Sequence, residues 1–110
     1  MARTKPDLLK GTLDMLVLKT LAMEPMHGWG ITHRIQQMSR DVLQVNQGSL
    51  YPALHRLMKR GWITSEWRTT ENSRRARYYI LTQSGEKQLK SEVEHWMKLS
   101  AAVTEIVETA

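Results

Sequence analysis

Apolar residues recur at helical spacing through the first third of the chain. Leucine and valine residues between Asp7, which can cap a helix, and about Leu21 fall on one helical face. Pro25 and the glycines after it then interrupt the helix, because proline disfavours helix in the preceding residue. The pattern predicts a second helix over about 28–39. Its inward positions are Ile31, Ile35 and Met38.

A third amphipathic segment leads into a predicted hairpin. Residues 47–60 indicate a helix that ends at Gly61, since glycine readily adopts a left-handed cap conformation. Pro52 falls near its first turn, where a missing amide proton costs little. The runs 62–67 and 76–81 are rich in β-branched and aromatic residues and alternate in part, which is typical of paired antiparallel strands.

The last stretch predicts one long helix that begins at a cap, Thr82 or Ser84, and reaches about Val107. At 1.5 Å per residue its length is roughly 38 Å, too long to pack fully on so small a body. Its apolar positions repeat in alternating steps of four and three, which is a heptad pattern. We expect a dimerisation helix; the alternative is a helix that lies on its own domain. The predicted interface positions are Leu89, Val93, Trp96, Met97, Ser100, Val103 and Val107.

Charge is unevenly distributed along the 110 residues, whose formal net charge is +5. Residues 1–81 hold 13 of the 16 Lys and Arg residues and 6 of the 11 Asp and Glu residues. The predicted three-helix body and hairpin are therefore basic, and a polyanion that contacts them gains counterion-release free energy. Charge alone is equally compatible with an ordinary solvated surface.

Cysteine is absent, which excludes disulfides, thiolate metal sites and a cysteine nucleophile. No apolar run approaches the roughly 20 residues that span a bilayer, and the N-terminal segment is too polar for a signal peptide. We therefore expect a cytoplasmic protein that does not associate with membranes.

The residue types that usually carry catalysis do not converge. His27, His33, His55 and His95 lie in different predicted elements, and no pair has the one-turn spacing of a helical zinc site. Ser49 and His55 point to different faces of their helix, and no carboxylate orients the imidazole. No glycine-rich phosphate loop is present. We expect neither an enzyme nor a metal or cofactor site.

The outward face of the third helix suits nucleic acid better. An α-helix fits the major groove of B-DNA when its start offers short polar and basic side chains. Gln47 and Ser49 are candidates for base edges or phosphates, whereas longer side chains further along diverge toward phosphates. For each residue alone, the alternative is a solvated helix face, and for Tyr51 it is partial burial with an exposed hydroxyl. The candidates are Gln47, Ser49, Tyr51, His55, Arg56 and Lys59.

The hairpin is the second candidate contact with DNA. Residues 69–75 are polar, and strand alternation places Arg75 and Arg77 on one face. A tip that carries Asn72, Ser73 and Arg74 can lie along a minor groove and hold phosphates. The alternative is an ordinary solvated turn.

With these residues identified, the chain resembles the PadR family of bacterial transcriptional regulators. The resemblance covers roughly residues 8–97, and the combination of strings is specific although each one is weak. The matching strings are LDMLVL at 13–18, HGWGI at 27–31, GSLYPALHRL at 48–57, GWI at 61–63, RRARYY at 74–79 and LT at 81–82.

The resemblance implies a mainly α fold with a small β-hairpin: a winged helix-turn-helix DNA-binding domain over 1–81 and a C-terminal dimerisation helix over 82–110, forming one compact unit. It implies a homodimer that binds operator DNA, usually a repressor released by a small molecule. The family's DNA contacts carry over to Ser49, Tyr51, His55, Arg74 and Arg75.

In some small members of that family an aromatic residue of the last helix stacks on planar drugs between the subunits. Trp96 occupies a similar place here. The alternative is that Trp96 only packs the dimer interface, as a tryptophan in a heptad stripe usually does. Because helix-turn-helix dimers bind two half-sites, we expect a pseudo-palindromic duplex site. The competing function is a ligand-sensing or protein-interaction module with only secondary DNA binding.

Overall fold

The computed structural model describes residues 10–109, and their elements follow the predicted order. The three short helices, the hairpin and the long last helix are confirmed, whereas Asp7, the predicted first cap, lies outside the described residues. The elements are α1 (Lys10–Met23), β1 (Met26–His27), α2 (Gly28–Met38), α3 (Gln47–Lys59), β2 (Ile63–Thr69), β3 (Arg75–Leu81) and α4 (Gln83–Val107).

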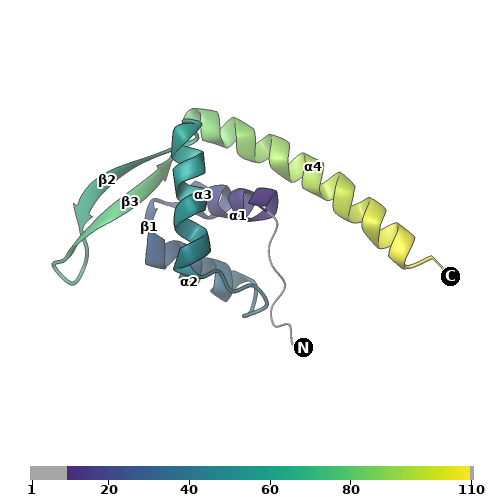
Figure 1. Cartoon of the computed structure of the whole chain (residues 1–110), viewed down its shortest axis with the longest axis horizontal. Coiled ribbons are helices and arrows are strands. Elements are labelled where there is room, and N and C mark those ends of the chain that lie inside the picture. Colours follow the sequence, from purple (N-terminus) through teal and green to yellow (C-terminus); the bar gives the residue numbers. More distant parts are fainter. Residues whose placement is uncertain (1–9, 110) are drawn as a thin grey trace.

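Helices α1, α2 and α3 contact one another and enclose the hydrophobic core (Figure 1). Its fully buried side chains include Leu18, Ile31 and Leu54, one from each helix. Met38, which was predicted to face the core, is 56% exposed, so that expectation is wrong. The reason is its position as the last residue of α2, one turn past Ile35, the final buried side chain of that helix.

The hairpin belongs to a three-stranded antiparallel sheet of order β1-β3-β2. Strands β2 and β3 pair from Ile63↔Leu81 to Thr69↔Arg75. The two-residue strand β1 was not predicted; it pairs Met26 with Tyr79 and His27 with Tyr78. Two residues are too few to show strand periodicity. This strand attaches the start of α2 directly to the hairpin.

The start of α4 is fixed to the body by a cap and a close backbone approach. Of the two predicted caps the structure uses Thr82, whose hydroxyl accepts a hydrogen bond from Gly85 N at 3.0 Å. A Cβ at Gly85 would collide with the carbonyl oxygen of Trp62, so only glycine fits there without a shift. Among residues 10–109 no helix combines the length and apolar character needed to cross a membrane.

Beyond its first turns α4 projects away from the body, on the side opposite the hairpin (Figure 1). It packs against α1, and Leu89 is partly buried against the core. Further along the same stripe, Met97 is 62% exposed and Val107 is 75% exposed. Only the first part of α4 therefore lies on its own domain. The apolar stripe further along the helix is not covered by any other part of residues 10–109.

Candidate nucleic-acid interface

The exposed face of α3 is positioned by a capped start and a buried opposite side. Asn46 caps the helix, because its Oδ1 accepts a hydrogen bond from Ser49 N at 2.8 Å. Leu50, Ala53, Leu54 and Leu57 are buried, which turns the remaining side chains outward. The predicted contacts of α3 that lie exposed are Gln47, Ser49, Tyr51, His55 and Lys59.

Two of the predicted contacts of α3 also have partners within the protein. Gln47 Nε2 donates a hydrogen bond to Thr32 Oγ1 at 3.1 Å, which links the starts of α3 and α2. Arg56 Nη2 lies 2.7 Å from Asp14 Oδ1, and its Nε lies 3.5 Å from Oδ2. This bidentate ion pair joins α3 to α1, so Arg56 has a structural partner that the helical pattern alone did not reveal.

The hairpin carries two of the predicted arginines on one face, as alternation predicts. Trp67 lies opposite Arg77 in the register, and Thr69 lies opposite Arg75. The guanidinium carbons of Arg75 and Arg77 lie 5.5 Å and 5.7 Å from the centroid of the Trp67 ring. Arg77 Nε also donates to Ser65 Oγ at 2.9 Å. Both cations are thus held beside a single indole.

The hairpin tip is a tight polar turn. Thr70 Oγ1 accepts hydrogen bonds from Asn72 N at 3.3 Å and from Arg74 N at 3.2 Å. Ser73 adopts a φ of 62°, a left-handed conformation that a turn of this kind requires. These bonds leave the side chains of Asn72, Ser73 and Arg74 exposed at the end of the hairpin.

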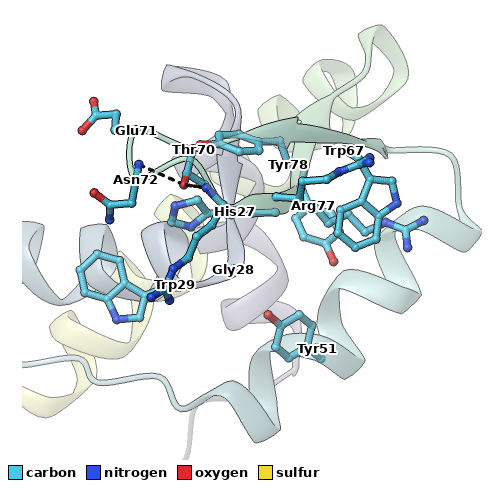
Figure 2. Close-up of a pocket in the computed structure, with 14 residues that line it drawn as sticks. His27, Gly28, Trp29, Tyr51, Trp67, Thr70, Glu71, Asn72, Arg77 and Tyr78 are labelled. Atoms are coloured by element: carbon cyan, nitrogen blue, oxygen red, sulfur yellow. Dashed lines mark hydrogen bonds between the residues drawn. The ribbon is translucent and has the colours of Figure 1, made fainter.

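A groove of about 1040 Å³ separates the hairpin from the starts of α2 and α3 (Figure 2). Tyr51 contributes to its helical side, and Arg75, Arg77 and Trp67 line its other side. Arg74 and Asn72 reach it from the hairpin tip. The groove therefore unites Tyr51 with all of the predicted hairpin contacts except Ser73. The lining does not include Ser49, His55 or Lys59, which lie further along the exposed face of α3.

Five aromatic residues that line this groove were not predicted from the sequence: His27, Trp29, Trp67, Tyr78 and Tyr79. His27 Nδ1 accepts a hydrogen bond from Gly30 N at 3.0 Å and so caps α2. Trp29 is 63% exposed and stacks on His33 with 4.6 Å between ring centroids. The available signal was the short string HGWGI, whose tryptophan precedes the apolar stripe of α2 instead of joining it.

Helices α2 and α3 approach closely where the Tyr51 hydroxyl lies against Gly28. A Cβ built on Gly28 would lie 2.6 Å from Tyr51 Oη, so any larger residue there would displace the phenol. The neighbouring Tyr79 is buried, and this burial raises the pKa of its phenol above the ordinary value. Of the groove's charged lining residues three are arginines and one, Glu71, is acidic.

The model of the PadR-like family of transcriptional regulators matches residues 17–91, which extend from α1 into α4 and include both α3 and the hairpin. That is more than half of the chain. The chain belongs to the PadR-like family.

Similar proteins agree with PadR-like membership. A transcriptional regulator of Mycobacterium tuberculosis is 36% identical over 76 residues, covering 69% of this chain and 67% of that protein. A solved transcriptional regulator from Clostridium thermocellum has 27% identity and a TM-score of 0.84, covering 94% of this chain and 100% of its own. A PadR family regulator from Eggerthella lenta has 31% identity and a TM-score of 0.77, with 92% and 86% covered.

These findings establish a transcriptional regulator with a winged-helix fold, and the PadR-like family implies that it binds DNA. The family and its solved relatives are regulators by description. Within residues 10–109 no cluster of three or more His, Asp or Glu side chains is arranged to hold a metal ion.

Proposed function

We propose that this PadR-like protein is a homodimeric repressor that binds a specific duplex DNA sequence and is released by a small-molecule effector. The observation that carries the proposal is the groove between the helices and the hairpin, which has Tyr51 of α3 on one side and a pair of arginines on the other. A phosphodiester strand that passes between a recognition helix in the major groove and a wing in the minor groove needs this arrangement of charge.

The residues divide into two roles on this proposal. Ser49 and Gln47 lie in the first turn of α3, where short side chains approach base edges, so they contribute sequence preference. Tyr51 and the groove arginines contribute affinity through phosphates. His55 and Lys59 extend the phosphate contacts along the helix, and the tip residues Asn72, Ser73 and Arg74 follow the minor groove. Arg56 acts by holding α3 on α1.

The dimer proposal rests on the uncovered distal stripe of α4. Trp96 is 40% exposed, Met97 62% and Val103 50%, an apolar surface that a second copy of the same helix would remove from water. Two copies would present two recognition helices to successive major grooves about 34 Å apart on a pseudo-palindromic site.

The proposed effector is a planar or hydrophobic molecule that binds beside Trp96 at the dimer interface. To release DNA it must favour one separation of the recognition helices over another. Planar aromatic compounds should then quench tryptophan fluorescence in the wild type and much less in Trp96→Ala, which retains Trp29, Trp62 and Trp67 as reporters. Equal quenching in both proteins would exclude Trp96 as the effector contact.

Fluorescence anisotropy with the DNA upstream of the protein's own gene tests the main proposal. Binding should prefer that duplex over a scrambled one, and the logarithm of the affinity should fall linearly with the logarithm of salt concentration. Arg74→Gln with Arg75→Gln should weaken all duplexes alike, whereas Ser49→Ala should change the preference between duplexes. An affinity that does not change with salt concentration, or equal affinity for scrambled DNA, would refute the proposal.

A further inference from the structure

We infer that Trp67 is a positioning residue of the DNA-binding surface: its indole holds the guanidinium groups of Arg75 and Arg77 together, facing the groove. This inference rests on the proposed function. Figure 2 shows Trp67 and Arg77 side by side along the wall of the groove, and both guanidinium carbons lie within 5.7 Å of the ring centroid.

The core does not explain an indole at this position. Trp67 is 56% exposed and is not among the residues that pack against the hydrophobic core. Its strand pattern runs from a buried Ile63 to exposed positions toward the tip, where a small polar residue would serve a hairpin equally well. A cation over an aromatic face is attracted by the negative charge of that face, so the ring has a role in holding arginine side chains.

The arginines on the two faces of the hairpin have different partners. On the face away from Trp67, Arg68 pairs with Glu66 at 2.6 Å and lies over the Tyr78 ring. On the groove face, neither Arg75 nor Arg77 lies within ion-pair distance of a carboxylate in residues 10–109. The groove face therefore holds two cations close together without neutralising them, which favours a phosphate as their partner.

The benefit for binding is preorganisation. A free arginine side chain loses rotamer freedom when it contacts a phosphate, and holding it beforehand removes part of that cost. An exposed cation–π contact is weak. Losing both contacts should therefore weaken the affinity for DNA only about threefold to tenfold. Ser65 remains to hold Arg77 Nε, which keeps the expected loss moderate.

The test measures the affinity of the full-length protein for its upstream duplex in three variants of Trp67. Trp67→Leu should bind roughly threefold to tenfold more weakly, and Trp67→Phe, which keeps an aromatic face, should restore most of that loss. Thermal denaturation without DNA controls for folding, and the half-exposed position predicts nearly unchanged midpoints. Trp67→Tyr provides a second aromatic rescue. Equal losses in the Leu, Phe and Tyr variants would overturn the inference.

A double-mutant cycle separates positioning from direct contact. In the background Arg75→Gln with Arg77→Gln, Trp67→Leu should cause no further loss, because the groups that it positions are gone. Arg68→Gln is the matched control: it removes one charge from the same hairpin on the other face, and the effect of Trp67→Leu should remain at full size there. A full effect of Trp67→Leu without the two arginines would show that the indole contacts DNA itself and would refute a positioning role.

The two proposals fail in different ways. If the wild type shows no salt-dependent preference for the upstream duplex, the proposed function fails and the inference falls with it. If the wild type binds and the arginine variants bind weakly, but Trp67→Leu binds as the wild type does, only the role of Trp67 is refuted.

Discussion

The ion pair between Asp14 and Arg56 gives the sharpest test of how α3 is held in place. Asp14→Asn preserves shape and removes one charge from a bidentate contact whose two distances are 2.7 Å and 3.5 Å. The carboxylate side chain is 19% exposed and the guanidinium 31% exposed. Arg56 would then remain half-buried beside a neutral amide, an incomplete replacement for its charged partner.

The magnitude follows from this intermediate burial. Exposed ion pairs stabilise proteins by about 0.2–1 kcal/mol, whereas breaking a fully buried pair costs about 3–5 kcal/mol. For the partly buried Asp14–Arg56 pair we expect a loss of about 1–2 kcal/mol, which lowers the midpoint of a chain of this size by about 4–8 °C. The matched control is Glu24→Gln, which breaks an exposed pair with Arg34 at 3.4 Å, with side chains 59% and 35% exposed. It should cost less than about 0.5 kcal/mol.

The assay is urea denaturation followed by circular dichroism, at one fixed protein concentration because a dimer's stability depends on concentration. Arg56→Gln and the double variant complete a cycle whose coupling energy should be about 1 kcal/mol. The reasoning is refuted if Asp14→Asn costs no more than Glu24→Gln, or if the cycle shows no coupling. If Arg56 acts only by holding α3, Arg56→Gln should also leave the salt slope of DNA binding unchanged.

Three further predictions concern other parts of the molecule. Gly28→Ala should change the free energy of unfolding by less than about 1 kcal/mol. It should nevertheless weaken DNA binding as much as Tyr51→Phe does, because the Cβ of the new alanine displaces the Tyr51 hydroxyl. The control is Gly11→Ala, which should leave DNA binding unchanged because a Cβ there has nothing within 4 Å. The thermal midpoint should fall on hundredfold dilution, and Val103→Lys should abolish that dependence while Ala101→Lys, on another face of α4, retains it. Burial raises the pKa of Tyr79 in the folded protein, so its phenol ionises at lower pH in the unfolded chain. The folded state should therefore lose stability as the pH rises from about 10 through the folded-state pKa of Tyr79. Tyr79→Phe should reduce this loss of stability at high pH.

Long periodic segments made most of the fold predictable from sequence. The alternation of apolar and polar positions located α3, the hairpin and α4, because each element buries one face against a common core. Strand β1 escaped because it has two residues and is defined only by its partner Tyr79, far away in the chain. Met38 fits the helical period of α2, but position in a helix does not reveal where the covering elements end.

The candidate site was predictable as a list of exposed residues but not as an arrangement. Strand alternation correctly grouped Arg75 with Arg77, since residues two apart share a face. The partners Asp14 of Arg56 and Thr32 of Gln47 come from other helices, and nothing local in the sequence specifies them. Trp67 resembles an ordinary strand residue until the register places it opposite Arg77. The proposed function therefore depends on tertiary contacts that periodicity does not encode.

A hydroxyl-radical footprint on the DNA upstream of the protein's own gene tests the central claim most directly. Two recognition helices in successive major grooves should give two protected patches centred about one helical turn apart and related by approximate two-fold symmetry. Arg75→Gln with Arg77→Gln should weaken both patches together, because both copies carry the same groove. A single patch would contradict the dimer, and uniform cleavage at concentrations where the protein is folded would contradict specific DNA binding by this surface.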